Sequence, residues 1–290
     1  MKIKRKYIPW LFLALPLVLY TIWVVGPTIY TIYLSFTEWD VISEPIFVGL
    51  DNYIDLFNDP VFYTSLINNF KWLAIFLAIP LTLGLFLALL LSQEIRGAKG
   101  FKAAIYSPMI LAPVVIGLIW SWIYQPSGGL LNNTLTFIGL DTLTRGWLSD
   151  PDTALYAVIA AAVWRHTGYV MLLFLSGLTA ISPTVIEASR IDGASPWQRF
   201  RYIIMPLLKP TTVIVLVITM IQSLRAFDFV SMMTRGGPFN STNVLAYYMY
   251  SEAFKNYKMG YGAAIAVILF AIMFIFIVFY LRQIRKGELE

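Results

Sequence analysis

The sequence contains no cysteine and a single histidine among its 290 residues. The absence of cysteine excludes a disulfide framework, a thiolate metal site and a cysteine nucleophile. One histidine argues against a multi-histidine centre, so we expect no metal ligands in this chain. Charge is scarce too, because Asp, Glu, Lys and Arg make up 13% of the residues, against about 25% in soluble domains. These shortages argue against a soluble protein built on thiol or metal chemistry.

Apolar residues take the place of the missing charge. They make up 59% of the chain, and the mean hydropathy is +0.72, a balance that indicates an integral membrane protein. The first apolar run extends from about Ile8 to Phe36. It is about twice as long as the 7–15-residue core of a secretory signal and lacks a convincing small-residue cleavage site. We expect an uncleaved first span, with irregularities at Pro16 and at Gly26-Pro27.

Five further apolar runs follow the first one. Each has about 20 residues or more, which is enough to cross a hydrocarbon core of about 30 Å as a helix. Backbone groups in lipid must be satisfied within the segment, and barrel strands would be about 10 residues long, so helices are expected. The runs are 72–91, 103–124, 154–177, 211–232 and 262–281. The sequence therefore predicts an all-α membrane protein with six transmembrane helices.

Lys and Arg residues near the span ends gather on one side, as they do on the cytoplasmic side of membrane proteins. Fourteen lie on that side: Lys2, Lys4, Arg5, Lys6, Arg96, Lys99, Lys102, Arg190, Arg199, Arg201, Lys209, Arg282, Arg285 and Lys286. Four lie on the other side: Arg145, Arg235, Lys255 and Lys258. We expect both termini to be cytoplasmic, and the net charge of +5 to reflect topology rather than a nucleic-acid partner.

The predicted organisation has two parts. Residues 1–67 would form the N-terminal transmembrane helix and an outer interfacial segment, and residues 68–290 a five-helix core with a cytoplasmic loop at 182–210. Short interfacial helices are expected over 52–66 and 242–257, with the tyrosines of the second, Tyr247 and Tyr248 among them, at headgroup depth. The first outer loop has no cation and six acids: Glu38, Asp40, Glu44, Asp51, Asp55 and Asp59.

The cytoplasmic loop contains two helix-start signals. Ser182-Pro183 is an N-cap followed by proline at the first helical position, and Gly193 is a natural residue to end that helix. A second start follows in Ser195-Pro196-Trp197-Gln198, a capping-box pattern. The loop is therefore predicted to be a compact helix–turn–helix, in which Glu187 and Arg190 can pair three residues apart. From these features alone, a solvated amphipathic loop stays an alternative.

The order of residues in this loop resembles the signature of permease subunits in ATP-binding-cassette (ABC) importers. That signature reads Glu-Ala-Ala, three residues, Gly, nine residues, then Ile-x-Leu-Pro. The positions that match in spacing are Glu187, Ala188, Gly193, Ile203 and Pro206. Two positions depart from it, since Ser189 replaces the third small residue and Met205 replaces Leu. Both substitutions keep the size or the apolar character of the side chain.

Segments elsewhere resemble the carbohydrate-uptake branch of that family, the maltose and glycerol-phosphate type. They are Phe47-Val-Gly-Leu-Asp-Asn-Tyr53, Phe227-Asp228 and Thr234-Arg-Gly-Gly-Pro238. The resemblance implies a type I ABC importer transmembrane fold in the inner membrane of a prokaryotic cell. In the family, the loop docks into a cleft on a cytoplasmic ATPase. The positions that would do so here are Glu187, Ala188, Ser189, Arg190, Asp192, Gly193, Ala194 and Pro206.

The resemblance also implies partners. They are a second homologous permease subunit, two cytoplasmic ABC ATPase subunits, an extracytoplasmic solute-binding protein and the lipid bilayer. The chain has no Gly-x-x-x-x-Gly-Lys-Ser/Thr loop to cradle phosphates, so we expect ATP and Mg on the partner ATPase, no cofactor on this chain and no catalysis by it. The alternative is a self-sufficient secondary transporter or channel. Such carriers usually show inverted repeats and acidic residues in several spans, whereas Asp228 is the only carboxylate in the six runs.

Several polar residues lie inside the fourth and fifth runs. A charge near the bilayer centre costs about 2.5–3.5 kcal/mol on insertion scales and needs a reason. Sugars are bound by planar polar groups together with stacked aromatic rings, and an Arg225–Asp228 ion pair would ease burial. The predicted substrate path consists of Trp164, Arg165, Gln222, Arg225, Phe227 and Asp228. The alternative is that these groups only tie helices together, and for His166 a helix–helix hydrogen bond is the favoured reading.

Overall fold

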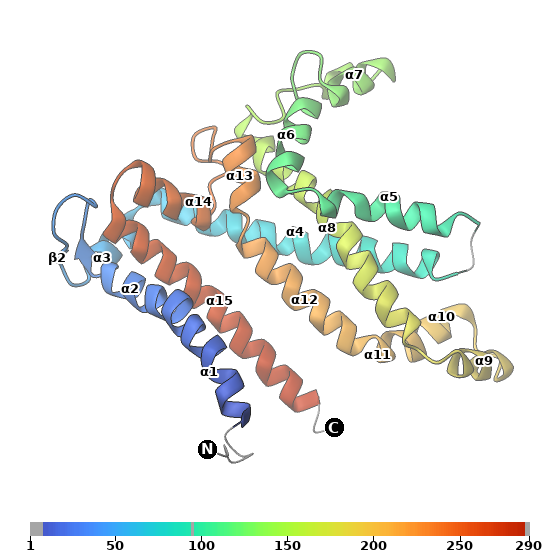
Figure 1. Ribbon diagram of the computed structural model, residues 1–290. Coiled ribbons are helices and arrows are strands. Elements are labelled where there is room, and N and C mark those ends of the chain that lie inside the picture. The colour runs from blue at the N-terminus through green and yellow to red at the C-terminus, as the bar shows by residue number, and fades with distance from the viewer. Residues whose placement is uncertain (1–7, 94–95, 288–290) are drawn as a thin grey trace. The chain divides into compact units, whose positions relative to one another are not determined.

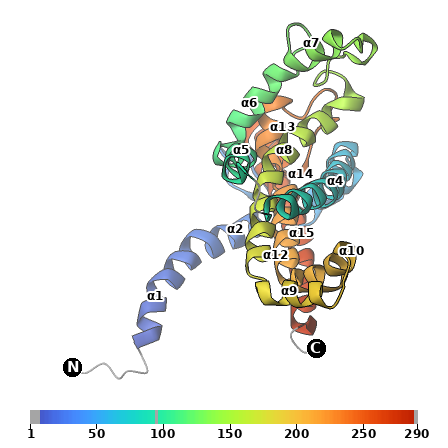
Figure 2. The same cartoon turned by 90° about the vertical axis from the view of Figure 1, so that its right-hand side faces the viewer.

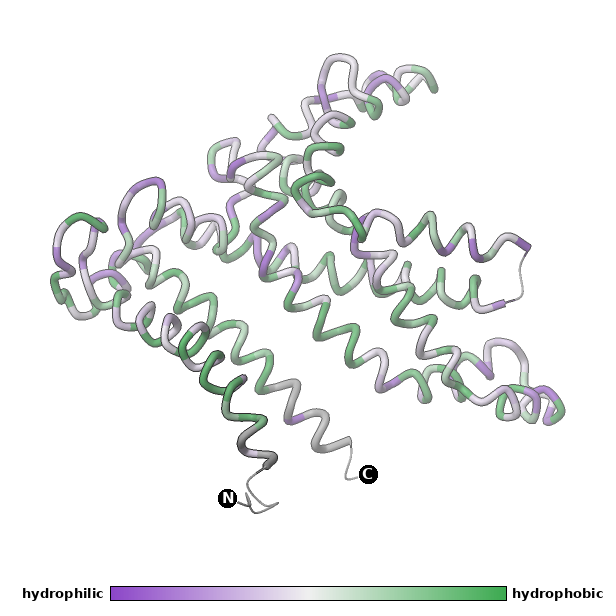
Figure 3. Tube along the Cα trace, viewed as in Figure 1, coloured by the Kyte–Doolittle hydropathy of each residue, from purple (hydrophilic) through white to green (hydrophobic). Residues whose placement is uncertain are grey.

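The computed structural model describes residues 8–93 and 96–287, and their regular secondary structure is helical apart from one short hairpin (Figure 1). The all-α prediction is confirmed. Within the described residues, five helices are long and apolar enough to cross a membrane, and they become six if one bent pair of helices counts as a span. The five are Phe12–Leu34, Pro60–Leu91, Pro151–Thr179, Lys209–Met233 and Met259–Val278. In Figure 3 these helices are mostly hydrophobic, and hydrophilic residues gather in the connecting loops.

The chain separates into two compact units. Unit 1 combines the described part of 1–62 with Tyr248–Ile272, and unit 2 combines Tyr63–Tyr247 with the described part of 273–290. These units are groups of residues in mutual contact, and they do not test the predicted division into 1–67 and 68–290. That division stays a prediction.

Unit 1 begins with the first span, which is irregular directly before Gly26-Pro27, as predicted, but continues as a helix through Pro16. Helix α1 (Ile8–Tyr20) contains Pro16, and a π-helical turn, η2 (Thr21–Val25), leads into α2 (Gly26–Leu34). Pro27 has no N–H to donate to the carbonyl four residues earlier, and its ring crowds that carbonyl. A wider turn directly before the proline relieves this conflict.

A hairpin and further helical segments follow in unit 1. Strands β1 (Thr37–Glu38) and β2 (Ile46–Phe47) pair antiparallel, and α3 (Asp51–Asn58) follows. The π-helical turn η5 (Ser251–Lys255) leads to α15 (Met259–Gly287). The Asn52 side chain donates to the carbonyls of Ser35 and Thr37 at 3.0 and 2.9 Å. A Cβ added at Gly260 would lie 1.7 Å from the Thr37 carbonyl oxygen, so only glycine lets α15 approach the hairpin this closely.

Two details of the interfacial prediction are corrected. The expected helix over 52–66 is divided at Asp59, which is extended (φ −89°, ψ 117°) because Pro60 follows it. Asp59 then accepts from the Val61 amide at 2.8 Å, at the start of α4 (Pro60–Leu91). The second segment is α14 (Leu245–Tyr250), and Tyr247 and Tyr248 are buried in the protein rather than exposed at headgroup depth.

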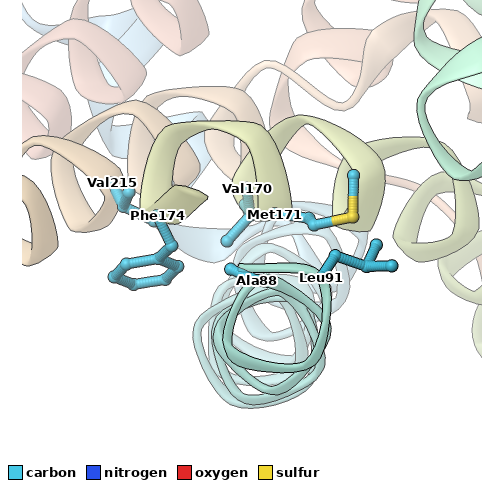
Figure 4. Close-up of a cluster of buried hydrophobic side chains, with 6 residues drawn as sticks. All are labelled: Ala88, Leu91, Val170, Met171, Phe174 and Val215. Carbon is cyan, nitrogen blue, oxygen red and sulfur yellow. The ribbon is translucent and has the colours of Figure 1, made fainter. Parts of the chain in front are cut away.

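The centre of unit 2 is α8 (Pro151–Thr179), the most deeply buried of the candidate spans. Figure 4 shows how its Val170, Met171 and Phe174 pack toward Ala88 and Leu91 of α4 and toward Val215. Val215 belongs to α12 (Lys209–Leu224). A Cβ at Gly168 would lie 2.2 Å from the Ile105 carbonyl oxygen, so this glycine lets α8 approach α5 (Ala98–Ile110), as small residues do between membrane helices.

The third apolar run, 103–124, is broken into two helices instead of forming one. Helix α5 is followed by α6 (Pro113–Ile123), and the two are bent by 102°. The cause lies in Pro113, which disfavours the helical region for the residue before it. Leu111 and Ala112 are accordingly extended, with ψ of 145° and 144°.

Different short helices lie at the two ends of unit 2. Beyond α6 lie α7 (Leu130–Phe137) and the 3-10 turn η3 (Asp141–Leu143). At the opposite end, in both Figure 1 and Figure 2, lie α9 (Pro183–Ile191) and α10 (Pro196–Arg199). The segment with α7, η3 and Arg145, a residue predicted to lie on the outer side, and the predicted cytoplasmic loop are therefore on opposite sides of this unit.

Candidate coupling loop and polar cavity

The first helix of the loop ends as its sequence predicts. Gly193 has a left-handed φ of +79°, and the amides of Gly193 and Ala194 donate to the carbonyls of Arg190 and Ser189 at 3.1 and 3.0 Å. These are the reversed bonds that close a helix on a C-terminal glycine. At the start, Ser182 occupies the N-cap position, but its hydroxyl bonds that of Thr184 at 2.7 Å rather than a backbone amide.

The second helix carries the predicted capping box. The Ser195 amide donates to Gln198 Oε1 at 2.8 Å, and the Gln198 amide donates to Ser195 Oγ at 3.3 Å. The chain continues through a π-helical turn, η4 (Phe200–Ile204), and a short α11 (Met205–Leu207) into α12. Both corners are fixed by local hydrogen bonds, so the loop is a compact pair of helices, as predicted.

The predicted coupling residues do not all face outward. Glu187, Ala188, Arg190, Asp192, Gly193 and Pro206 are exposed, and Ala194 is half-buried. Ser189 is buried and donates to the Ile186 carbonyl at 2.7 Å, so its side chain packs against its own helix. Glu187 and Arg190, both described by the structure, form no ion pair with each other.

Sequence reasoning missed two apolar residues of this loop. Ile191 is 86% exposed at the end of α9, and Trp197 is 67% exposed in α10. Large apolar side chains displayed by a rigid loop are typical anchors for a protein partner. The sequence did contain a signal for these exposed residues. Ile191 and Trp197 flank the turn at Gly193 in a polar loop, where a large apolar side chain has no protein core to pack into.

Four of the six predicted path residues line one small cavity of about 40 Å³ in unit 2. They are Arg165, Gln222, Arg225 and Asp228. The other lining residues include Trp72, Phe76, Pro113, Ala162, His166, Ala226 and Phe229. Gln222, Arg225 and Asp228 are exposed on this chain, so their polar face opens to the side of the unit.

Trp164 and Phe227 lie outside this lining. The ring of Trp164 packs edge-on against Trp120, with centroids 5.7 Å apart, and it borders an apolar groove. The ring of Phe227 lies 6.1 Å from that of Tyr247.

Arg165 caps the broken third span. Its Nε and Nη2 donate to the carbonyls of Leu111 and Met109 at 3.2 and 3.3 Å. The last carbonyls of a helix have no partner within it, and a cation at this end is favourable. A guanidinium presents a fork of donors that can serve two such carbonyls together. Arg165 therefore holds the bend between α5 and α6.

His166 ties two helices, as the favoured sequence reading has it. Its Nε2 lies 3.0 Å from the hydroxyl of Thr219 on α12. Its ring stacks on Phe76 of α4, with centroids 5.2 Å apart and an angle of 22° between planes. Three spans thus meet at this side chain.

The fifth span is also discontinuous at its polar residues. Helix α12 ends at Leu224, and α13 (Phe227–Met233) begins after Arg225 and Ala226. The Phe227 amide donates to the Arg225 carbonyl at 2.8 Å. This break removes the helical spacing on which the predicted Arg225–Asp228 ion pair depended, and these two described residues form none. Asp228 and Arg165 instead line the same cavity.

The two breaks lie in one region, because α6 packs on α13. A Cβ added at Gly117 of α6 would lie 3.2 Å from the Met232 side chain of α13. Irregular backbone at membrane depth is tolerated where it lines a cavity or lies within protein, and broken helices mark binding sites in many transporters. Sequence reasoning also missed Trp72, whose buried Nε1 has no acceptor among the described residues. Its place within a long apolar run gave no signal.

Comparison with known proteins gives a consistent result. Residues 6–286 match the family model described as "Binding-protein-dependent transport system inner membrane component". A probable ABC transporter permease protein of Pyrococcus horikoshii is 43% identical, over 96% of each chain. A probable starch degradation products transport system permease protein of Thermoanaerobacterium thermosulfurigenes is 34% identical, over 97% of this chain and 95% of that one. The crystal structure of a bacterial ABC transporter that imports the acidic polysaccharide alginate matches with a TM-score of 0.84 at 21% identity, over 97% of this chain and 96% of that one.

Proposed function

Since the chain belongs to the binding-protein-dependent transport family of inner membrane ABC permease components, we propose that it imports a sugar or related polyol. It is a non-catalytic subunit, and the energy for import comes from ATP hydrolysis on its partners. The observation that carries the proposal is the predicted coupling loop, in which two capped helices leave Ile191 and Trp197 exposed, where an ATPase could bind them. The saccharide class is supported by the named relative that transports starch degradation products.

The partners follow from the family and from the loop. We expect two ABC ATPase subunits at the loops of a permease pair, and a solute-binding protein on the other side of the membrane. ATP and Mg would bind to the ATPases and no cofactor to this chain. The loop and α7 lie at opposite ends of unit 2 (Figure 2), which suits partners on opposite faces. With the loop in the cytoplasm, the cation bias puts both termini there too.

The substrate path would be completed by the second permease. A cavity of about 40 Å³ has room for a few waters but not for a sugar ring. Gln222, Arg225 and Asp228 nevertheless face outward from unit 2, where a facing subunit would supply the second wall. Their contact with substrate remains part of the proposal, as do the roles of Trp164 and Phe227.

Alternating access gives each part of the site a role. Closure of the ATPases moves the rigid coupling helices, and binding of nucleotide or sugar shifts the balance between outward-open and inward-open states. The broken third and fifth spans provide points at which halves of a span can move separately. Arg165 and His166 would hold the central packing while the polar face opens.

The proposal is tested by reconstitution. The complete complex, placed in liposomes with its ATPases and binding protein, should accumulate radiolabelled maltose or xylose only when ATP is present on the ATPase side. Uptake by this chain alone, without ATPase or nucleotide, would instead establish an uncoupled transporter. No described feature supports that alternative.

A further inference from the structure

A second, larger cavity lies entirely within unit 1. Its volume is about 1000 Å³, and its walls come from the loop between α2 and α3, from α3, and from the segment between α14 and the first turn of α15. Four aromatic rings line it: Trp39, Tyr248, Tyr257 and Tyr261. The polar lining includes Asn52 and Asn256, six carboxylates (Glu38, Asp40, Asp51, Asp55, Asp59 and Glu252) and Lys258. Concave sites of this size, with aromatic walls and convergent polar groups, are typical of small-molecule binding.

The walls of this outer cavity are held by hydrogen bonds. Asp59 accepts from the hydroxyls of Tyr248 and Tyr261, the second at 2.9 Å, and this joins the start of α4 to α14 and α15. The Met259 amide donates to the Trp39 carbonyl at 2.9 Å. A cavity with fixed walls needs little reorganisation to bind a ligand.

Some carboxylates of the cavity accept hydrogen bonds within the protein, and others are free to accept them from a ligand. Asp40 accepts from the amides of Ile42 and Ser43 within its own turn. In contrast, Glu38, Asp51 and Asp55 are exposed, and their carboxylates form no hydrogen bond or ion pair with any described residue. Ionised carboxylates only accept hydrogen bonds, so these three suit a ligand rich in hydroxyl or ammonium donors.

The aromatic rings fit the same kind of ligand. Tyr257 is 61% exposed, and Trp39 uses its indole N–H on the Ser43 carbonyl at 2.8 Å, which leaves its faces for stacking. Aromatic side chains combine an apolar face with a polar edge. A sugar has complementary surfaces, with C–H groups on one face and hydroxyl donors at the rim.

We propose that the outer cavity of unit 1 is a saccharide-binding site that selects neutral or amino sugars and rejects acidic ones. The lining contains six acids and one lysine, which together give a net charge of −5. A uronate carboxylate would be repelled there, whereas an ammonium group would be attracted. The inference rests on the proposed sugar import and adds a place where sugar gathers before it reaches the spans.

Direct binding tests the site on the intact complex. The permease–ATPase complex in nanodiscs, without binding protein, would be examined by saturation-transfer difference NMR with maltose, xylose, glucosamine or glucuronate. We expect millimolar binding of the first three and none of glucuronate. Asp55→Asn and Tyr257→Asn should each weaken binding roughly tenfold, as expected for loss of one charge-assisted contact or one stacking ring. Asparagine is chosen at position 257 because the residue has φ +56°, which asparagine tolerates.

The matched control is Glu44→Gln. Glu44 is an exposed acid of the same loop that does not line the cavity, so this variant should bind like the wild type. The absence of signal from maltose, xylose and glucosamine would overturn the inference, and so would equal binding of all variants or binding of glucuronate. If the variants weaken association with the binding protein but not with sugars, the cavity is a docking surface for that protein and the inference is also overturned.

Failure of this inference is distinguishable from failure of the proposed function. ATP-driven sugar uptake by the complete complex measures the function, whether or not the outer cavity binds sugar. Normal uptake with no binding at the cavity removes the further inference alone. Absence of any sugar uptake removes the proposed function.

Discussion

The Arg165 guanidinium on α8 donates to the carbonyl of Leu111, the residue at which the third span bends, at 3.2 Å. An intramembrane arginine thus donates hydrogen bonds to backbone carbonyls that the bend leaves without partners. This contact links the most costly side chain of the fourth span to the break in the third. Arg165 is placed both to stabilise the fold and to border the polar cavity.

Replacement of Arg165 by methionine should destabilise the protein. It leaves the Met109 and Leu111 carbonyls without their donor, at a cost of about 1–3 kcal/mol for each group that finds no water. Arg165→Lys should restore part of the loss, because an ammonium can still reach one carbonyl. The measurement is denaturant unfolding of the solubilised chain, followed by tryptophan fluorescence.

Arg225→Met is the matched control for that experiment. Arg225 borders the same cavity but its described contacts include no side-chain hydrogen bond, so its removal should change stability by less than about 0.5 kcal/mol. Equal losses of stability in the two variants would contradict the capping role of Arg165.

Gly193→Val should disrupt coupling through backbone strain. The residue has φ +79°, and a Cβ there would meet no atom within 4 Å, so no clash contributes. The left-handed conformation costs an ordinary residue about 1–2 kcal/mol and a β-branched one more. Gly193→Asn should retain most activity because asparagine tolerates this conformation.

Co-purification of the ATPases and ATP-driven uptake measure the effect of these two variants. Gly100→Ala provides a control, since its Cβ also meets nothing within 4 Å and its φ is not left-handed. If the valine and asparagine variants behave alike, the turn at Gly193 does not govern coupling.

Ile191→Asp should release the ATPase while the fold persists. The side chain is 86% exposed, so the substitution removes no packing within the chain. In a docked complex, however, it would bury an unpaired charge at an apolar contact, which costs several kcal/mol. Pull-down of the ATPase measures the loss, and Ile191→Leu should leave binding near normal. Retention of the ATPase by the aspartate variant would place the contact elsewhere on the loop.

Asp59 should make unit 1 sensitive to acid. Burial opposes its charge, but hydrogen bonds from Tyr248, the Val61 amide and Tyr261 outweigh burial and hold the pKa of Asp59 below the usual 3.8. A lowered folded-state pKa contributes stability that is present above the unfolded pKa and is lost as pH falls through the folded one. The wild type should therefore lose stability below about pH 4.

Asp59→Asn is the variant that tests this prediction. It should be less stable than wild type at pH 7, and the difference should shrink as the pH falls below 4. Unfolding midpoints measured between pH 3 and pH 7 provide the comparison. A constant difference across that range would show that the Asp59 charge is not what the tyrosines stabilise.

Much of the architecture could be predicted because it depends on local rules. Apolar runs identified the spans, and Ser195 with Gln198 identified a capping box that the structure contains. The end at Gly193 was predictable because only glycine adopts φ +79° without cost. Each of these features is decided by a few neighbouring residues.

The rest depended on contacts between distant segments. Pro113 could have signalled the break in the third span, but the partner that makes it tolerable, Arg165, lies more than fifty positions away in the chain. The fifth span shows the same difficulty, since the spacing of Arg225 and Asp228 suggested an ion pair that the break at Ala226 removes. The outer cavity likewise joins 38–59 to 248–261, and no local pattern predicts that meeting.

The close contact at Gly260 has a consequence for which mutations the protein can tolerate. The Thr37 carbonyl occupies the space where any side chain would begin, so alanine is excluded as firmly as tryptophan. In a saturation screen selected for sugar uptake, position 260 should tolerate no substitution, although it lies far along the chain from both the coupling loop and the polar face. Such intolerance would reflect the role of Gly260 in the wall of the outer cavity rather than a contact with substrate or with the ATPase.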